Sequence, residues 1–377
     1  MSKGKNRFLL ALPGAFGPAG GLEMYDRLII KGFQQIARER GGACETLVLL
    51  DEDKHFDARY LDPAAPKLRA FAGSRPRFSA STLERLALFK PDLVVFGHVH
   101  FSPLALAARA LRPTVKQWFL TYGIDVWRRL NRVERVAIRT AQSTLSISDY
   151  TRTQLCKHNG VPTSAVQLLP CALDPFWAAD YAGKTGLPAP DPARPLLLTV
   201  ARLADSERYK GIDQVIRALP ALAKTIPGIR YAIVGTGTDR TRLEQVARDC
   251  GVSDHVEFRG RVSSADLAAA YAESSLFVMP SAKEGFGIVF LEAALFGKPS
   301  IGGNHGGTPE VIADGETGRL VTYDDVEGFA TVCAEMLADP DRLALMGQRA
   351  RARLDERFTD ATFVQTLRQL VVHQLDR

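Results

Sequence analysis

Apolar positions in the second half of the chain follow two alternating patterns. Short apolar runs rich in β-branched residues predict strands, and between them apolar residues such as Val215, Leu219 and Leu222 recur at helical spacing. The predicted strands are 196–200, 231–234, 256–258, 276–279 and 299–301. Because strands and helices alternate, this half predicts a parallel sheet with helices on both faces.

The first half of the chain repeats this alternation less regularly. Its predicted strands are 8–12, 46–50, 93–96, 115–120, 145–147 and 166–169, and its predicted helices are 21–40, 103–111, 127–141 and 150–158. A second doubly wound α/β domain is therefore expected. The segment 182–192 is rich in Pro, Gly and Ala and predicts a linker. We expect domains at 1–182 and 183–359, with a helix at about 360–377 packing back on the first.

Length and composition agree with two ordinary folded domains. A chain of 377 residues exceeds what one hydrophobic core usually organises, and 46% hydrophobic and 24% charged residues are typical of globular proteins. We expect no signal peptide and no membrane-spanning helix, since the apolar runs are too short. The five cysteines are scattered, which is typical of reduced thiols in a cytoplasm.

The net charge of +6 is unevenly distributed. Residues 1–190 carry 26 Lys and Arg against 16 Asp and Glu, whereas the remainder carries 22 against 26. A basic half attracts nucleic acid, anionic lipid or phosphorylated substrates, and charge alone does not choose among them. On the helix predicted at 127–141, arginines spaced four, three and four residues apart form one stripe, which is most often a solvated face. They are Arg128, Arg132, Arg135 and Arg139. A predicted basic loop contains Lys67, Arg69, Arg75 and Arg77.

Candidate chemistry lies in the loops after the strands, because ligands of open α/β sheets bind at the carboxyl ends of the strands. Arg202 and Lys210 follow the strand 196–200. Two cations in one loop suit a diphosphate, although such a pair is more often simply solvated. Gly235 and Gly237 follow the next strand, but Arg240 stands where a dinucleotide fingerprint needs its third glycine.

The segment after strand 276–279 carries the strongest candidate site. Residues 288–295 predict a helix, so Glu284 lies in the preceding loop and Glu292 just over one turn inside the helix. The loop exposes backbone N–H groups at a helix N-terminus, which favours a diphosphate. Glu284 could then accept hydrogen bonds from a sugar hydroxyl, and Glu292 from a ribose diol. As an alternative, Glu292 is a surface residue or a helix partner.

These motifs together resemble retaining glycosyltransferases of the GT-B fold, specifically glycosyltransferase family 4. Glu284 and Glu292, eight residues apart, match the two-glutamate motif of that family. Supporting motifs follow in family order over residues 202–318: Arg202 with Lys210-Gly211, then 234–237, 258–262, 306–310 and 314–318. The resemblance implies an α/β GT-B architecture, in which two doubly wound, Rossmann-like domains face each other across a cleft.

The resemblance also implies roles for particular residues. Glu284, Arg202 and Lys210 would be catalytic, with the two cations stabilising the departing diphosphate. Glu284 would hold the donor sugar together with the backbone of Gly285, Phe286, Gly287 and Ile288. Glu292 would bind the ribose, and Val262 would lie against the base. In the first domain, Gly20 and Gly21 would close over the diphosphate, although a Gly-Pro-rich loop is as readily a flexible turn.

The first domain departs from the family pattern after strand 115–120. Many members carry a histidine where this chain has Tyr122, and a phenol is not a base at neutral pH in the way that an imidazole is. Tyr122 and Asp125 are still assigned to the substrate site. His98 and His100 follow an earlier strand, where a packed or exposed histidine is commoner than a functional one.

The resemblance implies transfer of a hexosyl group, with retention, from a nucleotide-diphosphate sugar to a hydroxyl of a glycan or a polyprenyl-diphosphate-linked acceptor. GDP-mannose or a UDP-sugar is the expected donor. No cofactor and no metal are expected, because two cations replace the metal and no Asp-x-Asp cluster lies in a suitable loop. We expect a cytoplasmic protein, with the basic domain suited to an anionic membrane at its inner face.

Three other classes of function remain open from the residues alone. A nucleotide-sugar epimerase on a related two-domain fold would use the same sugar-diphosphate site. An NAD-dependent dehydrogenase is disfavoured by the incomplete glycine fingerprint. A nucleic-acid-binding protein is disfavoured because the basic charge does not interleave with an aromatic platform.

Overall fold

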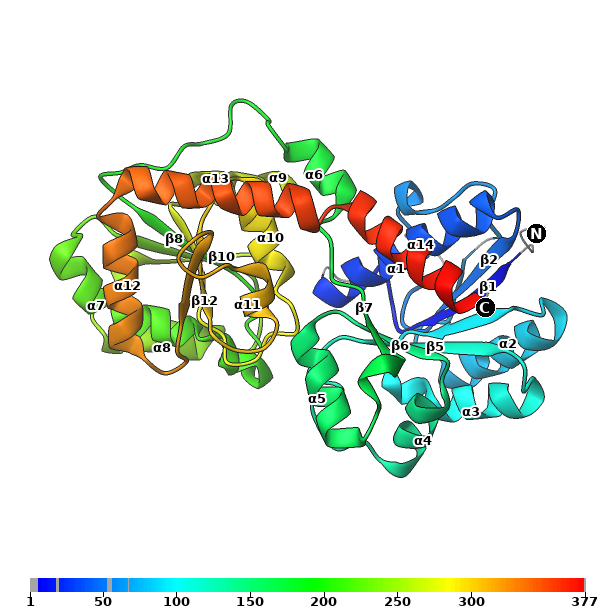
Figure 1. Cartoon of the computed structure of the whole chain (residues 1–377). Coiled ribbons are helices and arrows are strands. Elements are labelled where there is room, and N and C mark those ends of the chain that lie inside the picture. Colours follow the sequence, from blue (N-terminus) through cyan, green and yellow to red (C-terminus); the bar gives the residue numbers. More distant parts are fainter. Residues whose placement is uncertain (1–5, 18–19, 53–55, 67, 376–377) are drawn as a thin grey trace. The chain divides into compact units, whose positions relative to one another are not determined.

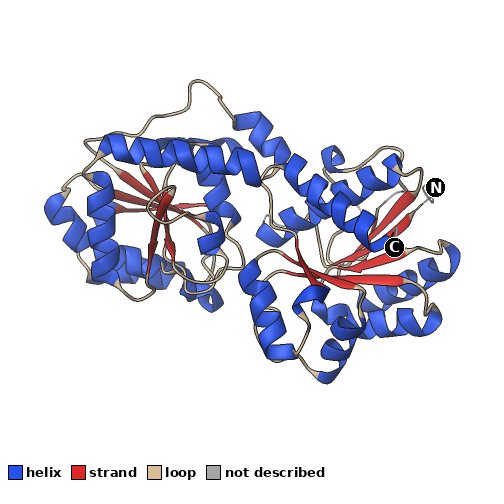
Figure 2. Cartoon of the chain, in the orientation of Figure 1, coloured by secondary structure: helices blue, strands red, loops and turns tan. Residues whose placement is uncertain are grey.

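The computed structural model describes residues 6–17, 20–52, 56–66 and 68–375. The chain divides into two compact units. Unit 1 comprises Met1–Asp174 with Asp360–Arg377, and unit 2 comprises Pro175–Thr359. In each unit a parallel sheet lies between helices, so both are α/β sandwiches of the doubly wound type (Figure 2).

Unit 1 is built on a parallel sheet which, within the described residues, has the strand order β3-β2-β1-β4-β5-β6-β7. Its strands are β1 (Arg7–Leu12), β2 (Ala43–Val48), β3 (Arg69–Ala70), β4 (Leu93–Phe96), β5 (Lys116–Thr121), β6 (Ser143–Ser146) and β7 (Val166–Leu168). Its α-helices are α1 (Gly21–Glu39), α2 (Arg75–Leu88), α3 (Ser102–Leu111), α4 (Arg132–Thr140), α5 (Asp149–Asn159) and α14 (Asp360–Leu375). The strand order reverses between β1 and β4, which is where ligands bind in such sheets.

Unit 2 repeats this plan, with the described strands in the order β10-β9-β8-β11-β12-β13, all parallel. Its strands are β8 (Leu196–Val200), β9 (Arg230–Val234), β10 (Val256–Gly260), β11 (Leu276–Met279), β12 (Ser300–Gly303) and β13 (Gly318–Val321). Its α-helices are α6 (Pro175–Tyr181), α7 (Ile212–Thr225), α8 (Arg240–Asp249), α9 (Ser264–Glu273), α10 (Ile288–Leu295), α11 (Thr308–Val311), α12 (Val326–Leu337) and α13 (Pro340–Arg357). Here the order reverses between β8 and β11.

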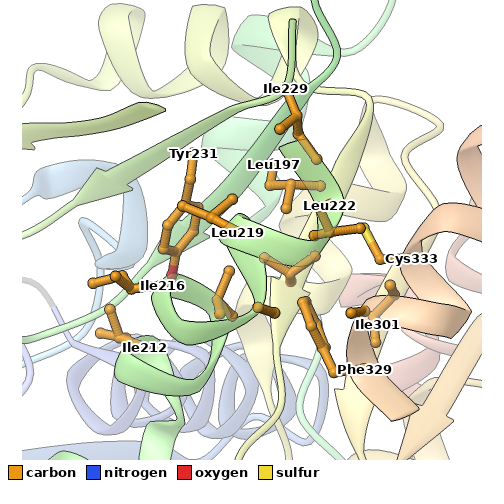
Figure 3. Close-up of a cluster of buried hydrophobic side chains, with 14 of the residues drawn as sticks. Leu197, Ile212, Ile216, Leu219, Leu222, Ile229, Tyr231, Ile301, Phe329 and Cys333 are labelled. Carbon is orange, nitrogen blue, oxygen red and sulfur yellow. The ribbon is translucent and has the colours of Figure 1, made fainter. Parts of the chain in front are cut away.

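The core of unit 2 explains why its sequence pattern is regular. The helix α7 turns one apolar stripe towards the sheet, and Figure 3 shows this stripe packed against side chains from β8, β9, β12 and α12. The labelled members are Leu197, Ile212, Ile216, Leu219, Leu222, Ile229, Tyr231, Ile301, Phe329 and Cys333. Truncating a buried leucine in such a cluster typically costs about 2–5 kcal/mol. This packing anchors α7 on the middle of the sheet, where β8 lies between β9 and β11.

The boundary between the units differs from the expected one. The chain leaves unit 1 after Asp174 rather than after residue 182. The reason is that α6 packs on unit 2, where the rings of Trp177 and Phe296 lie 5.5 Å apart. The segment 182–192 forms neither helix nor strand, but it lies within unit 2 and does not join the units.

The C-terminal helix α14 lies beside α1 in unit 1 (Figure 1). The ammonium group of Lys31 is 2.5 Å from a carboxylate oxygen of Asp360. Gly32 leaves room for Leu367, since a Cβ at this glycine would lie 2.8 Å from a methyl carbon of that leucine. Among the described helices, none is both long and apolar enough to cross a membrane.

The basic loop expected near residue 70 was a wrong interpretation. Arg69 belongs to β3, and Arg75 and Arg77 lie in the first turn of α2. Proline near the start favours this helix, and its arginines obscured the few buried positions in the sequence pattern. Lys67 lies outside the described residues.

The arginine stripe is shorter than expected, because α4 begins at Arg132. Asn131 and Glu134 form a capping box that starts the helix there. Arg128 lies before the helix, and its guanidinium is 3.1 Å from the Glu134 carboxylate. The stripe therefore consists of Arg132, Arg135 and Arg139, and Arg128 is an ion-pair partner of the cap.

Candidate functional site

The reversal of strand order in unit 2 brings two strand-to-helix segments together. The segment after β8 carries Arg202 and Lys210, and the segment after β11 carries Glu284. The two segments are joined by a hydrogen bond, in which the Ala282 N–H donates to the Tyr209 carbonyl at 2.8 Å. The structure thus brings together the three residues assigned to catalysis from the sequence.

The glycine after Lys210 holds this loop close to β11. Gly211 has a φ of +75°, and a Cβ there would lie 2.6 Å from the carbonyl oxygen of Pro280. A larger residue would suffer both backbone strain and a clash. Lys210 is consequently fixed where the two segments meet, and only 15% of its side chain is exposed.

One carboxylate that sequence reasoning missed lies between the two cations. Glu207 belongs to the short 3-10 helix Asp205–Lys210. Its Oε1 is 2.5 Å from Nη2 of Arg202, and its Oε2 is 2.6 Å from Nζ of Lys210. The Arg202 side chain is 72% exposed, whereas that of Glu207 is 12% exposed. Spacing alone gave no signal for this bridge.

Glu284 is a partly buried loop residue. Burial raises the pKa of its carboxyl group, the positive charge of Lys210 lowers it, and the negative charge of Glu207 raises it again. Hydrogen bonds from the backbone N–H groups of Phe286 and Gly285 favour the ionised form. The pKa stays above its ordinary value, so Glu284 is a carboxyl group whose ionisation depends on the charges beside it.

The Glu284 loop is braced by the glycines that follow β12. A Cβ at Gly306 would overlap the carbonyl oxygen of Glu284, and a Cβ at Gly307 would overlap that of Gly285. The Gly307 N–H donates to the Glu284 carbonyl at 2.8 Å. These glycines therefore act through packing, because they allow one backbone to lie directly on the other.

The helix α10 begins at Ile288 and ends at Leu295, which confirms the helix predicted from the sequence. Gly287 caps it with a φ of +96°, a conformation that favours glycine. Phe286, just before the cap, is buried. The loop from Gly285 to Ile288 thus ends on the N-terminus of a helix, where backbone N–H groups favour anions.

Glu292 lies inside α10 and is partly buried. Its Oε2 accepts a hydrogen bond from the Tyr271 hydroxyl at 2.6 Å. Burial raises the pKa of Tyr271 well above its ordinary value, so this phenol stays protonated and remains a donor. Tyr271 in turn stacks on Phe296 with ring centroids 5.8 Å apart. The carboxylate is therefore held in one orientation.

The remaining candidates in unit 2 flank these loops. A Cβ at Gly235 would overlap the carbonyl oxygen of Ala201, and one at Gly237 would overlap that of Leu203. Because these two residues have no Cβ, the segment after β9 can lie directly on the Arg202 loop. Close packing of the backbone is therefore a sufficient reason for both glycines. Val262 is partly exposed between β10 and α9.

In unit 1, one buried acid accepts hydrogen bonds from the backbone of the segment between β1 and α1. Asp51 is buried, and its Oδ2 accepts the N–H groups of Ala15 at 2.8 Å and Phe16 at 2.9 Å. Gly20 is the N-cap of α1, and Gly21 is its first residue. Pro18 and Ala19, which precede them, lie outside the described residues.

Tyr122 follows β5 and reaches an acid on α1 that sequence reasoning also missed. Its hydroxyl donates to Oδ1 of Asp26 at 2.6 Å. Asp26 is fully buried, and Oδ2 has no hydrogen-bond partner within the described chain. Burial raises the pKa of Asp26 well above its ordinary value, with the Tyr122 hydrogen bond opposing the shift. Burial also raises the pKa of Tyr122, so the phenol is neutral.

The side chain of Asp125 accepts a hydrogen bond from the backbone of its own loop. The Tyr122 N–H donates to its Oδ1 at 3.2 Å. Burial raises the pKa of Asp125 to about 7, while hydrogen bonds from backbone N–H groups oppose the shift. This carboxyl group shapes the turn that carries Tyr122.

The two histidines differ in their surroundings. His98 accepts a hydrogen bond at Nδ1 from the His100 N–H at 3.1 Å, and its ring lies 6.3 Å from that of Tyr122. Burial lowers the pKa of His98 to about 4, so it is neutral at pH 7. The His100 side chain is 68% exposed, with Nε2 3.9 Å from the Glu134 carboxylate. His98 is thus the packed histidine of the pair, and His100 is the exposed one.

Comparison with known sequences finds a matching family model for each half of the chain. Residues 20–175 match the family model described as Glycosyltransferase Family 4, and residues 188–353 match the one described as Glycosyl transferases group 1. A GDP-mannose-dependent alpha-(1-6)-phosphatidylinositol monomannoside mannosyltransferase of Mycolicibacterium smegmatis is 35% identical over 267 residues, covering 66% of this chain and 67% of the relative. An enzyme with the same description from Mycobacterium tuberculosis is 34% identical over 286 residues, covering 69% and 70%.

Solved structures give the fold over nearly the whole chain. Sucrose-phosphate synthase from Thermosynechococcus elongatus matches with a TM-score of 0.78 at 21% identity, covering 99% of both chains. Anabaena HepE, solved in complex with UDP and glucose, matches with a TM-score of 0.76 at 19% identity, covering 98% of this chain and 100% of its own. The chain therefore has the GT-B fold and belongs to glycosyltransferase family 4.

Proposed function

We propose that this glycosyltransferase moves a hexosyl group from a nucleotide-diphosphate sugar to an acceptor hydroxyl with retention at the anomeric carbon. The observation that carries the proposal is the meeting of Arg202, Lys210 and Glu284 at the point where the strand order of unit 2 reverses. That point is where doubly wound sheets bind nucleotides. Unit 2 is thus the proposed donor unit, and unit 1 the proposed acceptor unit.

The proposed reaction breaks the bond between the anomeric carbon and the diphosphate while the acceptor oxygen bonds to that carbon. Arg202, Lys210 and the N-terminus of α10 stabilise the negative charge that develops on the diphosphate. The acceptor proton passes to a leaving phosphate oxygen on the same face of the sugar. The two cations take the place that a divalent metal has in other transferases, so no metal and no cofactor is required in this scheme.

The other assigned residues position the donor. In the proposal, Glu284 and the backbone from Gly285 to Ile288 bind the sugar hydroxyls, Glu292 binds the ribose, and Val262 lies against the base. Gly20 and Gly21 bind the diphosphate from unit 1, and the loop of Tyr122 and Asp125 lies on the acceptor side.

GDP-mannose is the proposed donor and a UDP-sugar is the second candidate. The mycobacterial relatives are described as GDP-mannose-dependent, which supports the first, and HepE was solved with UDP, which supports the second. The same relatives act on a phosphatidylinositol mannoside by their description. A lipid-linked glycan is therefore the acceptor class we propose, with unit 1 docking at an anionic membrane surface.

A thermal-shift screen against GDP-, UDP-, ADP- and dTDP-sugars tests the donor class. We expect one nucleotide to raise the Tm, because a ligand that binds only the folded state stabilises it. With that donor, Glu284→Ala should abolish glycosyl transfer while its circular dichroism stays that of the parent. Asp205→Asn, an exposed acid of the same unit, is the matched control and should transfer normally.

Two results would contradict this proposal. One is a thermal-shift screen in which none of the four nucleotide sugars raises the Tm of the protein. The other is full transfer by Glu284→Ala, which would remove the sugar-binding role of this carboxyl group. Proton NMR of the product linkage would decide retention, since an inverted anomer would exclude the proposed stereochemistry.

A further inference from the structure

Both cations assigned to the diphosphate share one internal partner. Glu207 contacts Arg202 with one carboxylate oxygen and Lys210 with the other, at 2.5 and 2.6 Å. Both are ion pairs, and the oxygens of a phosphate group also pair with arginine and lysine. The carboxylate thus offers Arg202 and Lys210 the same type of partner that a diphosphate offers them.

The two ion pairs of Glu207 differ in how far they are exposed to solvent. Only 12% of the Glu207 side chain and 15% of the Lys210 side chain are exposed, so solvent screens the contact between them weakly. The contact with Arg202 is more screened, since that guanidinium is 72% exposed. Lys210 precedes Gly211, which lies close to Pro280, whereas the Arg202 guanidinium is paired with Glu207 but remains largely exposed to solvent.

The charges around Lys210 are nearly balanced within the chain. Arg202 and Lys210 contribute two positive charges, and Glu207 contributes one negative charge. Glu284 lies close enough for the charges of Lys210 and Glu207 to shift the pKa of its carboxyl group. A diphosphate carries at least two negative charges, so a bound diphosphate and Glu207 repel each other. Such like-charge repulsion weakens the binding of an anion at a partly buried site.

We propose that Glu207 is an internal counter-ion that competes with the donor diphosphate, and with the nucleoside diphosphate product, for Arg202 and Lys210. It is a positioning residue, because it acts through the two cations and is not assigned a contact with the substrate. It lowers the affinity of the site for the product and so helps the product to leave. This inference rests on the donor site under Proposed function.

The test compares the parent with Glu207→Gln, which keeps the shape of the side chain and removes its charge. Inorganic pyrophosphate, GDP and UDP are titrated calorimetrically into each protein. We expect Glu207→Gln to bind pyrophosphate and the preferred nucleoside diphosphate at least about tenfold more tightly, which is the size of effect that one charge has at a partly screened site. Donor KM should fall and product inhibition should strengthen, while kcat does not rise.

Asp205→Asn is the matched control, because it removes one acid of the same 3-10 helix. The Asp205 carboxylate is 2.6 Å from Arg208, and its neutralisation should leave pyrophosphate affinity unchanged. Glu207→Ala is the second charge-removing variant, in case Glu207→Gln does not fold. A shift towards tighter binding is expected for it as well.

The outcomes separate this inference from the proposed function. If the parent binds pyrophosphate and both Glu207 variants bind it equally or more weakly, Glu207 organises the cations for the ligand, and the inference is overturned. If neither the parent nor the variants bind pyrophosphate or any nucleoside diphosphate, the donor site itself is wrong. Equal tightening by Asp205→Asn would show a general charge effect and would also overturn the inference.

Discussion

A buried carboxyl group of unit 1 accepts a hydrogen bond from Tyr122, in the loop proposed to lie on the acceptor side. Asp26 is fully buried on α1, and its described hydrogen bond is the one it accepts from Tyr122. Burial raises its pKa well above the ordinary value. The folded protein therefore binds a proton here that the unfolded chain releases above about pH 4.

This proton predicts how stability depends on pH. Above about pH 4 the folded state holds more protons than the unfolded state at this group, so its contribution to the free energy of unfolding falls as pH rises. Asp26→Asn keeps an acceptor for Tyr122 and cannot ionise. We expect its stability relative to the parent to increase from pH 4 to pH 8, measured by urea unfolding.

Tyr122→Phe is the control for this effect. It removes the donor and leaves a buried oxygen unpaired, which typically costs about 1–3 kcal/mol. A difference between Asp26→Asn and the parent that is constant from pH 4 to pH 8 would contradict a raised pKa at Asp26.

At the residue scale, the sequence predicted the groups within one motif but not their partners. Glu284, Arg202 and Lys210 were named from spacing and resemblance, and the structure brings them together. Glu207 was not, because its contacts with Arg202 and Lys210 depend on the shape of the loop. Asp26 was not, because its partner Tyr122 is 96 positions away in the sequence. An acid among apolar helix positions looks the same whether it is paired or solvated.

At the element scale, α10 and α2 show what local pattern can decide. The helix α10 was predicted with its observed ends, because an apolar run follows a capping glycine. The helix α2 was missed, since its first turn carries arginines and few of its positions are buried. The start of α4 was misplaced because the capping box of Asn131 and Glu134 outweighed the arginine periodicity.

The proposed docking of unit 1 at a membrane predicts a role for the exposed face of α4. Val133 and Val136 are 42% and 43% exposed beside Arg132 and Arg139, which gives the helix apolar and cationic side chains together. Such a face suits an anionic lipid surface, where each basic residue contributes about 1 kcal/mol. Vesicle co-sedimentation with phosphatidylglycerol should therefore show at least about tenfold weaker binding for Arg132→Glu with Arg139→Glu.

The matched control reverses two exposed arginines on another helix of the same unit. Arg75→Glu with Arg77→Glu changes the net charge equally, on α2. An equal loss of vesicle binding in this control would show that overall charge, and not the α4 face, is responsible. No binding by the parent would remove the membrane proposal.

At the scale of the whole molecule, the alternation of strands and helices predicted two doubly wound sheets, and the family comparisons and GT-B neighbours confirm that architecture. Strand order is set by long-range pairing, so periodicity did not reveal which loops meet. The edge strands β3 and β13 were missed because they are short or contain glycine and arginine. The unit boundary depended on where Trp177 packs, which composition did not indicate.

The central claim is that Arg202 and Lys210 of unit 2 bind the diphosphate of the donor. The most direct measurement is calorimetric titration of the preferred nucleoside diphosphate and of its nucleoside into the parent and into Arg202→Ala with Lys210→Ala. We predict that the diphosphate strengthens binding to the parent and that this gain is lost in the double variant, while nucleoside binding is unchanged. A double variant that keeps the full gain from the diphosphate would contradict the account.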